Sequence, residues 1–150
     1  MKPTVRIQAA DFEVNAELTA LARDRSHVGA VASFVGLVRA DDGLIAMTLE
    51  HYPEMTEREI VRHIEDARAR WPIEGVTVIH RVGRLVPGAQ IVLVAAASRH
   101  RAAAFESCEF LVDYLKTRAP FWKLEERAGE KSWVEAKAAD DHAAERWRLK

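Results

Sequence analysis

The sequence predicts an α+β fold. Three observations lead to this class: two long segments have the apolar periodicity of amphipathic helices, short β-rich runs lie around them, and turn signals join some of these runs as hairpins. The chain has 150 residues, of which 49% are hydrophobic, so it is long enough to bury a core of its own. No stretch resembles an interdomain linker, and we expect a single domain over residues 1–150.

Strands and turns dominate the first third of the chain. Residues 4–8 (TVRIQ) alternate in polarity as a short strand does, and 18–23 are expected to form a short helix. The run 29–38 (GAVASFVGLV) is a predicted strand, in which Gly36 indicates a bulge or a close backbone approach. The turn signal Asp-Asp-Gly at 41–43 follows. The strand expected over 44–50 is therefore predicted to pair with 29–38 as a hairpin.

The clearest helix begins near Thr56. Thr56 and Glu59 have the spacing of a capping box. One apolar stripe follows at helical spacing: Ile60, Ile64, Ala67 and Trp71. Pro72 is expected to end this helix.

Two apolar strands precede the second helix. They are expected at 76–82 (VTVIHRV) and 91–97 (IVLVAAA), with a Pro-Gly turn signal at 87–88 between them. The second helix is predicted from about Arg101 to Arg118, and Pro120 forces its end. Its predicted buried stripe contains Phe105, Cys108, Val112 and Leu115, with Leu111 beside them.

A strand and a polar helix are expected at the C-terminal end. The strand is predicted at 132–137 (SWVEAK), after the segment Phe121-Trp122-Lys123, and the helix at 140–147. The mixed order of strands and helices supports the α+β class.

Composition excludes several classes of protein. Lys and Arg number 22 against 23 Asp and Glu, a formal net charge of -1, which gives no support to bulk binding of nucleic acid or an anionic membrane. The single cysteine excludes an internal disulfide framework. No apolar run approaches a membrane span, and no signal-peptide core is visible, so cytoplasm is the expected compartment. The six histidines show no metal-ligand spacing, and we expect no metal site.

Two basic segments could carry chemistry. Ser98-Arg99-His100-Arg101 lies where a strand meets a helix N-terminus, a place that favours an anion, although a solvated basic turn explains it equally well. In the segment 116–123 (KTRAPFWK), Lys116 and Lys123 flank a rigid aromatic turn. Aromatic surroundings can lower the pKa of a lysine and make it a proton donor or a nucleophile. The alternative for Phe121 and Trp122 is core packing.

Three other candidates have simpler explanations. Arg39 alone is a solvated charge at a strand end. His80 lies inside an apolar run and is expected to be a core histidine with its hydrogen bonds satisfied. Cys108 falls on the apolar stripe of the second helix, so a buried structural thiol is expected rather than a nucleophile.

Three segments together resemble the MoaE family, the large catalytic subunits of molybdopterin synthase. They are LEHYPEMTE (49–57), VIHRVG (78–83) and DYLKTRAPFWK (113–123), and the resemblance extends from about residue 12 to 147. It implies a fold of the α/β-hammerhead type, with an antiparallel sheet, two main helices and a small β subdomain. It also implies a sulfurtransferase of molybdenum cofactor biosynthesis.

The reaction and the partners are implied by the same resemblance. Sulfur passes from the thiocarboxylated C-terminus of a small ubiquitin-like subunit of the MoaD type to cyclic pyranopterin monophosphate, and this forms the dithiolene of molybdopterin. The family's large subunit forms a homodimer within a heterotetramer. No cofactor, metal, nucleic acid or membrane is implied.

The resemblance also assigns roles to individual residues. Lys116 and Lys123 are the implied catalytic pair, and Phe34 lines the pterin pocket. Arg39, His100 and Arg101 are implied to hold the phosphate. Lys137 stands where some relatives have an arginine that reaches the neighbouring subunit's site, and it keeps the charge without the bidentate fork.

The chain departs from the family pattern in two further places. The turn at 40–43 is short, and Val112 stands where some members have methionine. Two other classes remain as alternatives: a non-catalytic scaffold for a ubiquitin-like protein, and a binder of single-stranded nucleic acid that stacks bases on Phe121 and Trp122.

Overall fold

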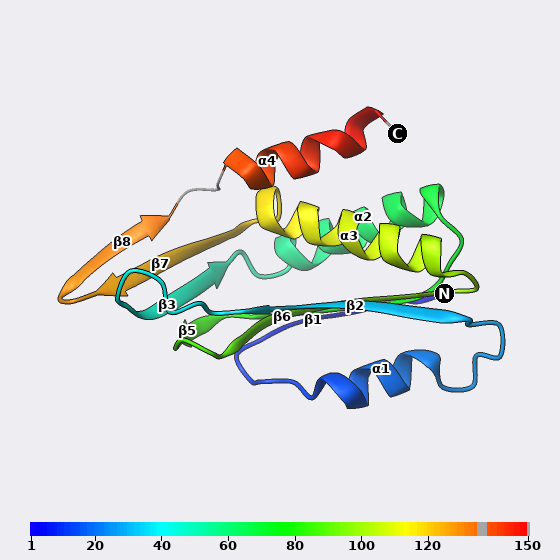
Figure 1. Cartoon of the computed structure of the whole chain (residues 1–150), viewed down its shortest axis with the longest axis horizontal. Helices are drawn as coiled ribbons and strands as arrows, with labels where there is room; N and C mark the ends of the chain where they lie inside the picture. Colours follow the sequence, from blue (N-terminus) through cyan, green and yellow to red (C-terminus); the bar gives the residue numbers. More distant parts are fainter. Residues whose placement is uncertain (135–137, 150) are drawn as a thin grey trace.

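The computed structural model describes residues 1–134 and 138–149, which form two four-stranded sheets flanked by helices (Figure 1). The elements in chain order are β1 (Thr4–Gln8), α1 (Val14–Ala22), β2 (Ala30–Leu37), β3 (Leu44–His51), α2 (Met55–Arg70), β4 (Ile73–Arg81), β5 (Gly83–Leu85), β6 (Gln90–Ser98), α3 (Arg101–Thr117), β7 (Phe121–Arg127), β8 (Glu130–Val134), α4 (Ala138–Glu145) and a 3₁₀ turn (Arg146–Leu149). The expected α+β class is confirmed, with α2 and α3 as the two main helices and the second sheet as the small β unit.

The first sheet has the order β1-β4-β6-β2. Its central strands, β4 and β6, are buried along most of their length, as their near-continuous apolar runs predict. Helices α2 and α3 cover one face of this sheet and α1 covers the other, while α4 lies over α3 (Figure 1). β1 runs parallel to β4, whereas the other pairs are antiparallel, so the sheet is mixed rather than wholly antiparallel.

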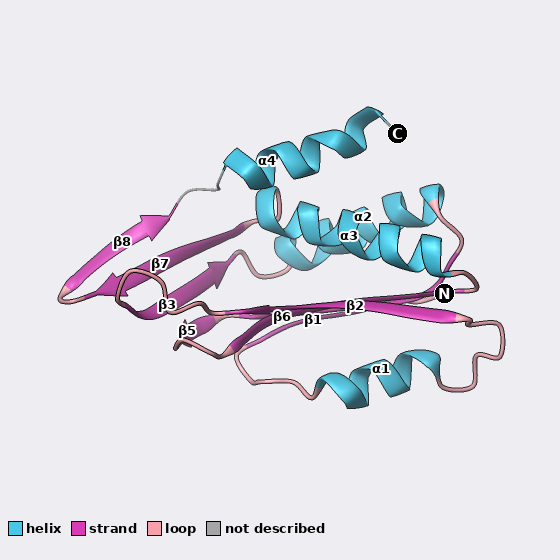
Figure 2. Cartoon of the chain, in the orientation of Figure 1, coloured by secondary structure: helices cyan, strands magenta, loops and turns pink. Residues whose placement is uncertain are grey.

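The second sheet has the order β5-β3-β7-β8 and lies at one end of the first (Figure 2). The hairpin predicted between 29–38 and 44–50 is therefore wrong. β2 pairs antiparallel with β6, and β3 pairs with β5 and β7 in the other sheet. The predicted turn is present, with positive φ angles at Asp42 and Gly43, but it redirects the chain from one sheet to the other.

Strand β2 is irregular at Gly36, as the position of this glycine predicts. The register between β2 and β6 shifts between Gly36 and Leu37, which confirms the bulge. A Cβ atom added at Gly36 would lie 2.8 Å from the side-chain atom Cγ1 of Val92, so a larger residue would fit only if that side chain moved. β2 can therefore bend there, just before the turn that leads the chain to the second sheet.

Helix ends and faces differ from the predictions in three places. α1 begins at Val14, four residues before the helix expected at 18–23. No capping box forms at Thr56, because this residue lies inside α2 and its hydroxyl donates to the Tyr52 carbonyl at 2.8 Å. Phe105 is 66% exposed, and the buried face of α3 instead runs through Ala104, Cys108, Leu111 and Tyr114.

The C-terminal elements also differ from their expected bounds. The segment after Pro120 is a strand, β7, that was not predicted as one, and β8 begins two residues before the expected strand at 132–137. The last three residues of that expected strand lie outside the described residues. Over the described ranges, no helix combines the length and the apolar character that crossing a membrane requires.

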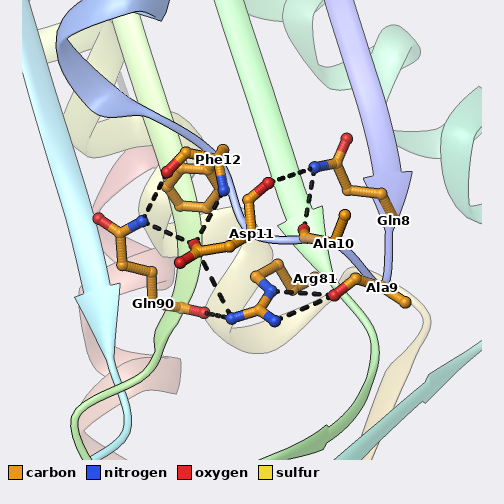
Figure 3. Close-up of polar contacts among 7 residues, drawn as sticks. All are labelled: Gln8, Ala9, Ala10, Asp11, Phe12, Arg81 and Gln90. Carbon is orange, nitrogen blue, oxygen red and sulfur yellow. Dashed lines mark hydrogen bonds and ion pairs between the residues drawn. The ribbon is translucent and has the colours of Figure 1, made fainter.

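A polar network secures the end of β4 (Figure 3). The Arg81 guanidinium donates to the carbonyl oxygens of Ala9, at 3.0 and 3.1 Å, and of Gln90, at 3.0 Å. The Gln90 amide in turn donates to the Asp11 carboxylate at 2.8 Å, and this bond lowers the pKa of Asp11. The network joins the loop after β1 to β4 and β6, so it holds the backbone next to His80 in place.

Candidate functional site

A cavity of about 530 Å³ opens where the first sheet, the second sheet and the C-terminal end of α3 meet. β2, β4 and β6 contribute Phe34, Leu37, His80, Ile91 and Val92. β3 and β7 contribute Leu44, Met47, Leu49, Phe121, Trp122, Lys123, Glu125 and Arg127. The first sheet therefore contributes mostly apolar side chains, and the charged side chains come from α3, β7 and the turn after β2.

The two lysines singled out in the sequence face the same cavity. Lys116 lies in the last turn of α3 and is exposed, while Lys123 is the third residue of β7 and is half-buried. Between them, the Tyr114 carbonyl accepts the N–H groups of Arg118 and Ala119, which closes the helix before Pro120. The proline turn thus returns the chain along the cavity, and both lysines line it.

Charges of both signs surround the cavity. Among the described lining residues, Arg39, Lys116, Lys123 and Arg127 are cationic, and Asp41, Asp42 and Glu125 are anionic. Arg39 pairs with Asp41 at 3.1 Å, with both side chains exposed, so a ligand can compete for this arginine at little cost. The small excess of positive over negative side chains favours an anionic ligand with several acceptor oxygens.

Arg127 was not singled out in the sequence. Its guanidinium lies 2.8 Å from Glu125 Oε1, and this hydrogen bond raises the pKa of Arg127. It also donates to the Asp42 carbonyl at 3.1 Å, which ties β7 to the turn after β2. Lys123, Glu125 and Arg127 alternate along β7 and so share one face of the strand. This alternation could have identified Arg127 from the sequence, but only if residues 121–127 had been recognised as a strand.

His80 is a buried histidine with a satisfied hydrogen bond, as expected, but it also lines the cavity. Its Nδ1 lies 2.8 Å from the Arg81 carbonyl oxygen, and its ring stacks on Phe121 with 3.8 Å between the ring centroids. Burial, with a smaller contribution from the Lys116 charge, lowers the pKa of His80 to about 4. One face of the Phe121 ring is therefore packed against His80, as the core-packing alternative predicts.

The low pKa of His80 predicts that acid destabilises the protein. Between pH 6.5 and about 4, the unfolded chain binds a proton at this histidine that the folded protein does not. The free energy of unfolding should therefore fall as pH falls, by roughly 1.4 kcal/mol per unit in this window. Urea titrations at pH 7 and pH 5 measure the change. Burial also lowers the pKa of His63, so His80→Gln, with a shallower pH slope, isolates the His80 contribution. An equal slope in the variant would contradict the assignment.

Cys108 is buried in α3, as expected, and it does not line the cavity. Its Sγ contacts the Val94 carbonyl oxygen at 3.5 Å, and burial raises the pKa of the thiol to about 12. The thiol therefore stays protonated near neutral pH and is a poor nucleophile.

Replacing Cys108 by alanine is expected to leave turnover unchanged, because in the reaction that the resemblance implies the sulfur arrives on the partner. The lost packing should lower the free energy of unfolding by about 1 kcal/mol. Activity assays and urea titration on the same preparation test both statements. A folded but inactive variant would show that the thiol takes part in the chemistry.

His100 and Arg101 do not join this cavity within one chain. Both are exposed at the N-terminal end of α3, whereas Lys116 is in its last turn. At 1.5 Å per residue, the helix separates them from Lys116 by roughly 23 Å. The structure therefore brings together Phe34, Arg39, Lys116 and Lys123 from the implied set, and Lys137 lies outside the described residues. In the described part of the chain, no group of three or more His, Cys, Asp or Glu side chains is arranged to hold a metal ion.

Comparisons with known proteins bear on the family and the overall fold of the chain. The family model described as MoaE protein matches residues 7–118. A molybdopterin synthase catalytic subunit from Mesorhizobium japonicum is 58% identical over 99% of this chain and 95% of its own length. A solved structure of molybdopterin cofactor biosynthesis protein E from Burkholderia multivorans is 47% identical, with a TM-score of 0.86, and covers 100% of this chain and 99% of its own. The crystal structure of molybdopterin synthase from Staphylococcus aureus is 26% identical, with a TM-score of 0.80, and covers 89% of this chain and 98% of its own.

Proposed function

This chain belongs to the MoaE family, and we propose that the cavity beside Lys116 and Lys123 is its active site. The chain acts as the catalytic subunit of a molybdopterin synthase, a sulfurtransferase of molybdenum cofactor biosynthesis. Sulfur comes from the thiocarboxylated C-terminus of a small ubiquitin-like subunit, and cyclic pyranopterin monophosphate receives it. The family's assembly, a homodimer with one small subunit at each outer end, applies to this chain.

One observation carries the assignment of the cavity. Phe34 and Arg39 come from one segment and Lys116 and Lys123 from another, more than 70 residues further along the chain, and all four line the same cavity. Both reactants are anionic, since one carries a thiocarboxylate and the other a cyclic phosphate. A wall in which cations outnumber carboxylates suits them, and its apolar side chains suit a planar pterin.

Each residue has a role in this proposal. Lys116 polarises the thiocarboxylate or shuttles protons as sulfur attacks the pterin side chain, and Lys123 assists it. Arg39 leaves Asp41 to bind the phosphate with its planar fork of donors. Phe34 forms part of the wall against the pterin. Neither the chain's own thiol nor a metal enters these steps.

We assign His100 and Arg101 to the cavity of the second copy in the homodimer. A single chain holds these residues roughly 23 Å from Lys116 along α3, so they cannot serve the cavity of their own chain. A site shared across the dimer axis would bring both to the phosphate. Lys137 is proposed to reach across in the same way.

A single-turnover assay tests the function as a whole. Purified protein is mixed with cyclic pyranopterin monophosphate and the thiocarboxylated small subunit, and the product is followed as its oxidised fluorescent derivative. Product formation is the expected result. Binding of the small subunit without product would instead indicate a scaffold. We also place the reaction in the cytoplasm, since a chain with one cysteine has no disulfides that need an oxidising compartment.

A further inference from the structure

His80 has two distinct ring nitrogens, and only one of them is used by the backbone. The Arg81 carbonyl can only accept a hydrogen bond, so Nδ1, at 2.8 Å, carries the proton that is donated to it. Nε2 therefore carries the lone pair of a neutral ring. This nitrogen is a hydrogen-bond acceptor on a side chain that lines the cavity.

The ring cannot easily leave this orientation. It stacks on Phe121 at an interplanar angle of 14°. The backbone next to it is held by the Arg81 network, which joins β4 to Gln90 and to the loop after β1 (Figure 3). A side chain held by a stacked ring and by a hydrogen bond to the backbone presents its remaining acceptor at a constant position.

The Nε2 atom of His80 faces the cavity. The buried polar side-chain atoms without a hydrogen-bond partner in the described residues are His51 Nδ1, His63 Nδ1 and Tyr114 OH. His80 Nε2 is not among them, although the residue as a whole is only 6% exposed. Lys116 lines the same cavity, and its charge is close enough to act on His80.

We propose that His80 is a positioning residue of the active site, whose Nε2 accepts a hydrogen bond from the Lys116 ammonium and directs that group toward the reacting atoms. The inference rests on the proposed function of the cavity. A carboxylate in this place would raise the pKa of the lysine and hold its proton. A buried neutral imidazole orients the ammonium without an opposing charge, so the lysine keeps its ability to give up a proton.

Two substitutions separate this role from a purely structural one. His80→Gln keeps an acceptor near the position of Nε2 and loses the donor to Arg81. His80→Asn keeps the donor near the position of Nδ1 and loses the acceptor in the cavity. We expect the Gln variant to retain kcat within a few-fold and the Asn variant to lose about ten- to a hundredfold, the value of a hydrogen bond to a charged group. The KM for the small subunit should be unchanged in both.

The opposite order, with Asn active and Gln impaired, would reduce His80 to a backbone anchor. Equal losses in the two variants would also overturn the proposal, since the acceptor would then be irrelevant. Both variants are first compared with the unsubstituted protein by circular dichroism and small-subunit binding.

A measurement without turnover tests the hydrogen bond itself. In protein labelled with ¹⁵N at histidine, the His80 Nε2 resonance should move in Lys116→Met and stay in place in Lys123→Met, a matched loss of one lysine from the same cavity. No response to Lys116→Met would overturn the proposal. Because this readout needs no substrate, failure of the proposed reaction and failure of the His80 assignment can be told apart.

Discussion

Lys116→Ala is expected to lower the single-turnover rate of product formation by about a thousandfold, which is within the range for removal of a proton-transfer or charge-stabilising group. Lys116 lies at the end of α3 and lines the same cavity as Lys123 and Arg39, where we propose that the thiocarboxylate and the phosphate meet. Loss of this charge removes the group that we propose polarises the thiocarboxylate. The measurement is product formed from a saturating thiocarboxylated small subunit.

Arg118→Ala is the matched control for this substitution. Arg118 is an exposed cation two residues further along the chain, and it does not line the cavity. We expect it to react at the unsubstituted rate. Full turnover by Lys116→Ala, with the small subunit bound, would remove this lysine from the mechanism.

Mixing two inactive variants is expected to restore activity if the site is shared across the dimer. Lys116→Ala and Arg101→Ala each damage every site in their own homodimers. In a mixed dimer, one cavity has both substitutions and the other has neither. After random exchange of subunits, roughly a quarter of all cavities should be intact. Single-turnover amplitude measures that fraction.

The control for this experiment pairs Lys116→Ala with Lys123→Ala. Both residues belong to the cavity of one chain, so no mixed dimer contains an intact site and no recovery is expected. If the first mixture gave only the average of its two components, Arg101 would not act on a partner's cavity. His100→Ala in place of Arg101→Ala repeats the test for the other residue at that end of α3.

Local sequence signals predicted most of the elements that build the site. These signals lie within short stretches of sequence: the apolar stripe of α2, the continuous apolar runs of β4 and β6, and the prolines after both main helices. They were found at close to their observed bounds. The bulge at Gly36 and the burial of Cys108 were likewise predicted from their positions. The segment 116–123 was also identified as a lysine-bearing turn.

Tertiary structure alone decided the pairings and the meeting of distant residues. β2 pairs with the apolar strand β6 and not with β3, the strand that comes after its turn. β7 has a charged sequence, and it is a strand because β3 and β8 pair with it. The pairing of the strands also decides that Arg127 and His80 line the cavity. The length of α3 separates Arg101 from Lys116 within one chain. The sequence by itself thus determined the class, the main elements and the residue types suited to the chemistry, because these depend on short-range propensity and periodicity. Which strands pair and which of those residues share a cavity depends on contacts between segments far apart in the chain, which no local pattern specifies.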